Sequence, residues 1–295
     1  MIKQPNEDTL RGLGFALSAY VFWGFLPLYL KLMEHIPVLE ILAHRVLWSV
    51  PIAGLILLVL RRTGDIGRVL RDPKALAMGC VTATLVSINW GTYVWAVSVG
   101  RALDGALGYY INPIFSVFLG AVLLGERLNR LQWGAVALAA LAVAFLTYET
   151  GSLPWPAIVL TFSWGFYAYF KRSLPIGPNQ GFLLEVLILS PVAIGYLVWL
   201  GAQGGGHFVP PSFDMWLLMG CGIITAVPLM LYANGAKGLR LATIGIMQYI
   251  VPTMIMLIAV FVFEEPFGHA RAVAFPLIWA ALGLYTYAIF RGRRA

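Results

Sequence analysis

Long apolar segments, each about as long as a helix needs to be to cross a bilayer, occupy most of this 295-residue chain. Hydrophobic residues make up 60% of the sequence and charged residues only 11%, whereas a soluble domain carries about a quarter charged residues. In lipid, every backbone polar group must be satisfied internally, so only helices and closed barrels can span the membrane. Apolar runs of about 20 residues match the helix length, and the sequence therefore predicts an all-α integral membrane protein.

Charged residues, prolines and glycines divide the sequence into ten such segments. They cover residues 11–31, 37–60, 75–99, 102–124, 131–147, 154–172, 180–200, 213–236, 242–263 and 269–290. We therefore expect ten transmembrane helices and no separate soluble domain. If the N-terminal side is inside, most lysines and arginines are also inside, and the loop cations left outside are Lys31, Arg101 and Arg271. This bias predicts cytoplasmic N- and C-termini.

Two stretches of the chain repeat each other at one fixed offset. The first contains Tyr93, Arg101, Tyr110, Ile111, Pro113 and Glu126, which recur 139 positions later as Tyr232, Arg240, Tyr249, Ile250, Pro252 and Glu265. Trp23-Gly24-Phe25 is likewise echoed by Trp164-Gly165-Phe166. Five spans form an odd number, so the second half should enter the membrane from the opposite side. We expect two inverted five-helix repeats, residues 1–150 and 151–295, that work by alternating access.

Charged residues within apolar segments are costly and are therefore candidates for function. Glu40, His44 and Arg45 lie at the start of the second segment, and Glu40 and His44 share a helical face. Glu40 would stabilise a charged His44, which fits proton coupling or the binding of a substrate carboxylate. The alternative interpretation is an interfacial salt bridge that anchors the outer end of the helix.

Three further acidic residues leave two interpretations open. Glu126 and Glu265 occupy matching positions at the ends of long apolar runs, so they share a role either in fixing a helix end or in ion coupling. Glu185, within the seventh segment, is either a protonated buried acid or the partner of a basic residue on another helix.

Aromatic and amide side chains near the middle of the segments form a second group of candidates. The predicted substrate-binding residues are Trp23, His44, Asn89, Tyr93, Tyr110, Asn112, Trp164, Glu185, Tyr232, Gln248 and Tyr249. Packing or an interfacial belt explains most single aromatic residues. A belt would not explain pairs that recur mid-segment in both halves, so we expect several of them to line a central cavity. Pro113 and Pro252 each free a backbone carbonyl inside a helix, which can kink the helix or serve as a ligand.

The sequence lacks the short signatures of common enzymes and ATP-driven pumps. It contains no glycine-rich phosphate loop ending in Lys-Ser/Thr, no His-Glu-x-x-His and no Gly-x-Ser-x-Gly. We therefore expect no enzyme activity, no cofactor, no metal site and no ATPase subunit. The net charge of +7 comes from cations that flank apolar segments, so it signals membrane orientation and not a nucleic-acid partner. The expected partners are a small-molecule substrate and the lipid bilayer.

Several motifs together resemble the RarD branch of the EamA-like drug/metabolite transporters. In the first half they are Tyr20-x-x-Trp23-Gly24-x-x-Pro27-x-Tyr29-x-Lys31, Glu40-x-x-Ala43-His44-Arg45-x-x-Trp48-Ser49, Asn89-Trp90-x-x-Tyr93-x-Trp95-Ala96-Val97, Gly108-Tyr109-Tyr110-Ile111-Asn112-Pro113 and Gly125-Glu126-Arg127-Leu128. In the second half they are Pro175-x-Gly177, Leu184-Glu185, Gln248-Tyr249-Ile250-x-Pro252-Thr253 and Glu264-Glu265-Pro266-Phe267. The resemblance covers nearly the whole chain.

This resemblance implies ten helices in two inverted repeats, both termini in the cytoplasm and a central cavity between the halves. It also implies a secondary transporter of the bacterial inner membrane that exports small metabolites or drugs. A facilitator or exchanger of amino-acid-like metabolites that needs no gradient is the alternative, and an intramembrane enzyme or a receptor is a more distant one. One residue departs from the family pattern, because Glu264 stands where a small residue, often glycine, is expected.

Overall fold

The computed structural model describes residues 8–59, 61, 67, 69–125, 128–171, 174–239 and 241–292. Within these residues the chain forms helices and no strand, which confirms the all-α prediction. In chain order the helices are α1 (Leu10–Gly24), α2 (Leu26–Lys31), α3 (Val38–Val59), α5 (Pro73–Ser98), α6 (Ala102–Leu124), α7 (Arg130–Thr150), α8 (Trp155–Lys171), α9 (Pro178–Ala202), α10 (Phe213–Gly235), the 3₁₀ turn η1 (Ala236–Gly238), α11 (Leu241–Met247), α12 (Ile250–Phe261) and α13 (Gly268–Gly292). Each predicted segment corresponds to one helix or to two helices joined end to end.

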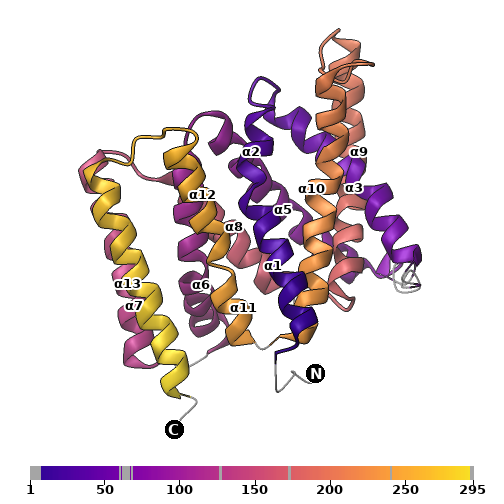
Figure 1. Ribbon diagram of the computed structural model, residues 1–295. Helices are drawn as coiled ribbons and strands as arrows, with labels where there is room; N and C mark the ends of the chain where they lie inside the picture. The colour runs from indigo at the N-terminus through magenta and orange to yellow at the C-terminus, as the bar shows by residue number, and fades with distance from the viewer. Residues whose placement is uncertain are drawn as a thin grey trace.

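Eight of these segments are long and apolar enough to cross a membrane. They are α1 with α2, then α3, α5, α6, α7, α9, α10, and α11 with α12. The 17-residue α8 and the helix α13 lie outside this group, so the count of ten spans stays a prediction. α1 begins and α13 ends at the same end of the molecule, which we call the N-terminal end (Figure 1). The opposite end is called the far end below.

Two of the segments are interrupted, and prolines lie near both breaks. The first break is at Phe25, between the end of α1 and the start of α2. Phe25 lies two residues before Pro27. The second is at Gln248 and Tyr249, so Pro252 falls in the first turn of α12, where a backbone N–H is not required. α6, by contrast, continues through Pro113.

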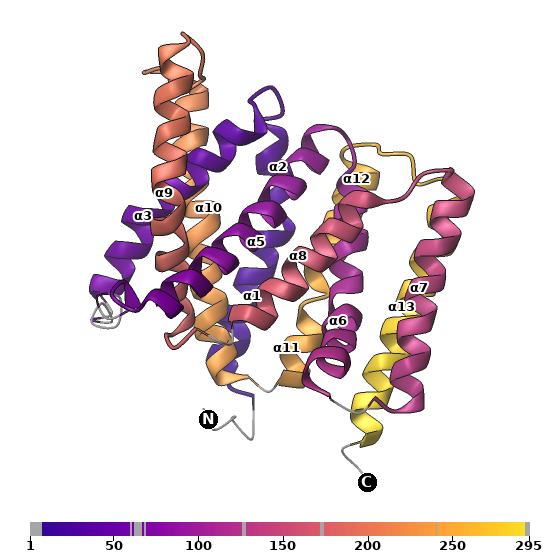
Figure 2. The ribbon, with the colours of Figure 1, turned by 180° about the vertical axis from the view of Figure 1, so that it is seen from behind.

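The most extensive helix contacts join helices before residue 150 to helices after residue 151. Three pairs are α3 with α9, α6 with α12, and α7 with α13. Six further pairs are equally part of this group. They are α3 with α10, α5 with α9, α6 with α8, α1 with α12, α1 with α10, and α5 with α8. Figures 1 and 2 show α7 beside α13 at one flank of the molecule, with α3, α9 and α10 at the other. The two parts of the chain are therefore interleaved.

Glycines allow the closest of these helix contacts. A side chain at Gly222 of α10 would collide with the backbone of Trp48 on α3. An added Cβ at Gly108 of α6 would lie 2.7 Å from the carbonyl oxygen of Ala157 on α8. Small residues let helix backbones approach each other in lipid, where packing and not the hydrophobic effect drives association. These contacts bring α3 against α10 and α6 against α8, next to the candidate site.

Candidate substrate-binding site

A buried arginine on α3 is the core of the candidate site. Arg45 is only 3% exposed, and its guanidinium lies over the ring of Trp90, with 4.8 Å from Cζ to the ring centroid. Its Nε donates a hydrogen bond of 3.1 Å to the hydroxyl of Thr225. Three helices, α3, α5 and α10, thus hold the cation with an aromatic face and a hydroxyl.

Several polar atoms near Arg45 are buried without a hydrogen-bond partner among the residues that the structure describes. They include Nη1 of Arg45, the hydroxyl of Ser49 and the hydroxyl of Tyr93. Ser49 lies one helical turn after Arg45, and Tyr93 and Tyr109 lie near the guanidinium. The salt bridges found within the described ranges do not involve Arg45. The described residues of this region are therefore rich in donors and provide no carboxylate to the cation.

Asn89 positions one of these aromatic residues. Its side-chain nitrogen donates to the carbonyl of Leu160 at 3.2 Å and to the hydroxyl of Ser163 at 3.0 Å. Its Oδ1 accepts a hydrogen bond of 3.2 Å from the hydroxyl of Tyr109. Tyr109 lies beside Tyr93, with ring centroids 5.5 Å apart. The predicted site residue Asn89 thus links α5 to α6 and α8, and its own polar atoms are used in that link.

The second predicted intramembrane charge, Glu185 on α9, is paired. Its Oε1 accepts from the ammonium of Lys171 on α8 at 2.6 Å, and its Oε2 accepts from the hydroxyl of Tyr167 at 3.1 Å. The Glu185 side chain is 1% exposed and that of Lys171 is 18% exposed. The sequence left open whether Glu185 is a protonated buried acid or the partner of a basic residue on another helix. The structure shows the pairing, with Lys171. The predicted residue Trp164 packs on Tyr167, with ring centroids 5.3 Å apart.

Glu40 and His44 contact the loop between α9 and α10 at the far end. Glu40 accepts from the backbone N–H of His207 at 2.6 Å and pairs with Nδ1 of the same residue at 2.9 Å. The indole N–H of Trp48 donates to Nδ1 of His44 at 3.2 Å, which assigns a neutral imidazole. His44 also stacks on Phe208 at 4.9 Å. Glu40 therefore pairs with His207 and not with a charged His44, and this contact joins the start of α3 to the loop.

Trp23 and Tyr232 come together, as members of an aromatic cluster between α1 and α10. Their ring centroids are 5.7 Å apart, and Tyr20 lies 5.8 Å from Tyr232. The hydroxyl of Tyr20 also reaches the carbonyl of Ile244 on α11 at 3.4 Å. Tyr93, the repeat counterpart of Tyr232, belongs to the arginine site instead, so the two tyrosines do not form one group.

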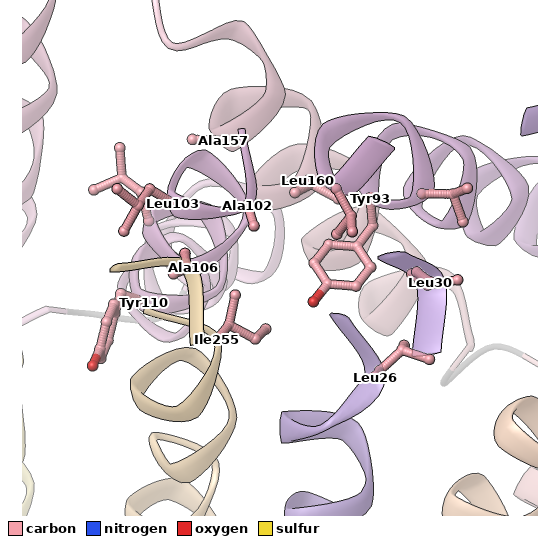
Figure 3. Close-up of a cluster of buried hydrophobic side chains, with 14 of the residues drawn as sticks. Leu26, Leu30, Tyr93, Ala102, Leu103, Ala106, Tyr110, Ala157, Leu160 and Ile255 are labelled. Atoms are coloured by element: carbon pink, nitrogen blue, oxygen red, sulfur yellow. The ribbon is translucent and has the colours of Figure 1, made fainter. Parts of the chain in front are cut away.

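Tyr110 and Tyr249 lie in a different region from Tyr93. The hydroxyl of Tyr110 is 2.7 Å from that of Thr253, and both tyrosines line an apolar groove of about 720 Å³ bounded by α6, α11, α12 and α13. Figure 3 shows Tyr110 and Tyr93 on opposite sides of Ile255. The structure therefore does not bring these two predicted residues together.

No hydrogen bond within the described ranges connects the two predicted amides, Asn112 and Gln248, to the residues around Arg45. Asn112 on α6 is 6% exposed, and its Oδ1 is buried without a hydrogen-bond partner in the described part of the chain. Gln248 is half-buried in the break between α11 and α12.

Glu265 fixes a helix end, which was one of its two predicted roles. Its carboxylate accepts from the backbone N–H groups of Ala102 at 2.7 Å and Leu103 at 3.0 Å, at the N-terminus of α6. Burial raises the pKa of this carboxyl above its ordinary value, although both N–H groups and Arg271 favour the charged form. Its repeat counterpart Glu126 lies outside the described residues.

Sequence reasoning missed the long-range partners of these residues. Thr225, which binds Arg45, and Asp104, which pairs with Arg101 and Arg271, were not predicted. Thr225 has no repeat counterpart and no motif, so no signal in the sequence marks it. Asp104 could have been found as an acid in the first turn of a helix, beside a loop cation.

Comparison with known proteins gives a consistent assignment. Residues 10–148 match the model of the EamA-like transporter family. The chain is 41% identical to an uncharacterised transporter, YojE, of Bacillus subtilis, over 98% of both chains. It is 38% identical to the protein RarD of Streptomyces exfoliatus, over 99% of this chain and 93% of the relative. A crystal structure with 20% sequence identity has the same fold, with a TM-score of 0.60 over 94% of this chain and 98% of its own.

Proposed function

Because the chain belongs to the EamA-like transporter family, as a RarD-like member of the drug/metabolite transporter superfamily, we propose that it exports small organic metabolites or drugs across the bacterial inner membrane. Its apolar helices make it a multi-pass membrane protein, and its family and relatives point to a transporter and not an enzyme. The loop charges favour cytoplasmic N- and C-termini.

The mechanism that we propose is alternating access between two inverted repeats, residues 1–150 and 151–295. Its main support is the pattern of helix packing. Exchanging the first five segments with the last five, in order, converts each of the extensive pairs into another extensive pair or into itself. For example, α3 with α10 becomes α9 with α5. A pseudo-twofold arrangement of this kind allows two equivalent conformations, each open to one side.

The ends of α6 and α12 give independent support for the repeat. Gly125 follows α6 with a φ of 67°, and Glu264, three residues after α12, has a φ of 57°. These residues are 139 positions apart, the same offset as the other repeated residues. The left-handed conformation favours glycine. This explains why a glycine is expected where Glu264 stands.

The test is a flux measurement in which one end of the protein can be locked. Liposomes with the purified protein are loaded with amino acids, aromatic acids and nucleosides, and the efflux of each solute is followed by mass spectrometry. The lock is a disulfide between Thr9→Cys and Gly238→Cys in a Cys80→Ser, Cys221→Ser background. The two positions are close enough for this disulfide. Thr9 donates its backbone N–H to the carbonyl of Gly238 at 3.0 Å, and a Cβ added at Gly238 would lie 2.5 Å from Oγ1 of Thr9.

We expect at least one solute to leave faster than from protein-free liposomes, oxidation to stop this flux and a reductant to restore it. The single-cysteine variants under the same oxidant are the controls. Flux that continues after complete oxidation would contradict alternating access at this end. The absence of any flux under every imposed gradient would contradict transport itself.

A gradient-independent exchanger is the second candidate function, and the acidic residues favour it. Glu40 binds His207, Glu185 binds Lys171, and Glu265 binds the N-terminus of α6. Each of these carboxylates thus has a structural partner, which leaves it less suited to carry a proton through the transport cycle. Equal flux with and without an imposed pH gradient would support the exchanger, whereas flux that follows the gradient would support coupled export.

A further inference from the structure

Arg45 is a buried cation that, unlike Lys171 and Lys31, has no acidic partner among the described residues. Lys171 binds Glu185 on the neighbouring helix, and Lys31, at the end of α2, binds Glu34. Arg45, by contrast, is 3% exposed and contacts an aromatic ring and a hydroxyl. Its charge is therefore not neutralised by any salt bridge within the described residues.

The depth of this residue makes the missing partner costly. Arg45 lies seven residues after Val38, the first residue of α3. At 1.5 Å per residue this is about 10 Å from the start of a helix about 33 Å long. At this depth an arginine needs a compensating group, and charged residues kept inside a membrane protein commonly serve substrates or ions.

The free groups around Arg45 fit an anion. One face of the guanidinium is covered by Trp90 and its Nε is used by Thr225, which leaves Nη1 without a hydrogen-bond partner among the described residues. Within the described ranges, the hydroxyls of Tyr93 and Ser49 also have no hydrogen-bond partner and can donate. A guanidinium edge binds the two oxygens of a carboxylate or phosphate in a planar, bidentate way.

The surroundings of the cation indicate the rest of the ligand. Trp90 stacks on the guanidinium, and the rings of Tyr93 and Tyr109 lie next to each other nearby. Aromatic rings of this kind bind apolar or aromatic groups. The site therefore combines one positive charge with aromatic walls.

We infer that Arg45 binds the oxyanion group of the transported substrate, and that the substrate class is small organic anions with a carboxylate or a phosphate on an apolar or aromatic body. This inference rests on the proposed transport function. It assigns Arg45 to direct contact with substrate and Asn89 to positioning Tyr109 beside the site.

The first experiment compares matched probes on the purified wild-type protein. The probes are N-acetyl-L-phenylalanine, its carboxamide and phenyl phosphate, and the readout is the rise in melting temperature as each is titrated. We expect at least one of the two anions to stabilise the protein and the neutral amide to have no effect. The two anions separate a carboxylate site from a phosphate site. Equal stabilisation by the amide, or none by either anion, would overturn the inference.

The second experiment changes the arginine. Arg45→Gln should weaken the apparent affinity for the active anion at least tenfold, and Arg45→Lys should retain part of it. Arg271→Gln removes a cation at the far end and is the matched control, with unchanged affinity expected. Arg45→Gln with wild-type affinity would overturn the inference, and if this variant does not fold, the wild-type probe series still decides.

Flux of the same compounds separates this inference from the proposed function. If the protein transports neutral solutes and Arg45→Gln does not change their flux, the transport function stands and the anion site is contradicted. A protein that the anion stabilises but that moves no solute would retain the site and remove the transport function.

Discussion

Two helices that pack against each other, α3 and α9, carry opposite charges at the same position. Arg45 and Glu185 each lie seven residues after the first residue of their helix. Pro51 and Pro191 each follow six residues later. Glu185 is neutralised by Lys171, whereas Arg45 has no carboxylate partner in the described part of the chain. Matching positions on the two helices thus carry charges of opposite sign. The charge of Glu185 is neutralised within the protein, whereas the charge of Arg45 is suited to a ligand.

The largest expected effect comes from breaking the internal pair. Glu185→Gln leaves the Lys171 ammonium, whose side chain is 18% exposed, without its counter-ion. Removing one partner of a buried pair costs about 3–5 kcal/mol. We expect a large fall in the unfolding temperature of the detergent-purified protein, with much of it recovered in the double variant Lys171→Gln/Glu185→Gln.

Arg45→Gln, at the position on α3 that matches Glu185 on α9, is the control for that experiment. Arg45→Gln removes a charge that lacks an acidic partner, so it should lower the unfolding temperature less than Glu185→Gln. Equal losses in the two variants would show that the two charges have the same structural role, and the comparison would fail.

A smaller effect is expected from two matched tyrosines. Tyr167→Phe removes a hydroxyl that donates to Glu185 at 3.1 Å, and a hydrogen bond to a charged group is worth about 1.5–3 kcal/mol. Tyr93→Phe removes a buried hydroxyl without a partner among the described residues, so it should leave stability unchanged or raise it. Thermal unfolding of both variants measures the contrast. A greater loss for Tyr93→Phe would assign an unseen structural partner to Tyr93.

The smallest effect concerns the helix ends at Gly125 and Glu264. A non-glycine residue in the left-handed region costs about 1–2 kcal/mol, part of which is offset by the greater chain entropy of glycine. Glu264→Gly should therefore stabilise the protein by about 0.5–1 kcal/mol, and Gly125→Ala should destabilise it by a similar amount. An added Cβ at Gly125 meets no atom within 4 Å, so the second variant tests conformation alone. A loss of stability in Glu264→Gly would indicate that this side chain has an essential contact.

Much of the fold could be predicted because the period and length of apolar segments carry the signal. The helices lie where the apolar runs lie, and the family was found from short motifs that span nearly the whole chain. Pro113 and Pro252 occupy matching positions, yet α6 continues through Pro113, whereas the segment formed by α11 and α12 is interrupted just before Pro252, at Gln248 and Tyr249. A proline inside a helix alone does not determine whether neighbouring helices keep the helix continuous.

The candidate site was harder to predict because side-chain partners depend on how helices rotate against each other. Glu40 meets His207, and Arg45 meets Thr225, across 167 and 180 residues of sequence. Nothing in the local sequence of either partner records that rotation. Glu265 was the exception, since an acid at a helix end has a restricted choice of partners.

The interleaved packing of the helices has a consequence for biogenesis. A ribosome delivers α1 to α7 to the bilayer before α8 to α13 exist, and the partners that cover most of their inner faces are in the part still to be made. Asn89 and Arg45 then have neither Ser163 nor Thr225 to bond, and must be solvated by lipid headgroups, water or an insertion factor. Assembly of this protein is therefore a late event, completed only when the last helices have entered the membrane.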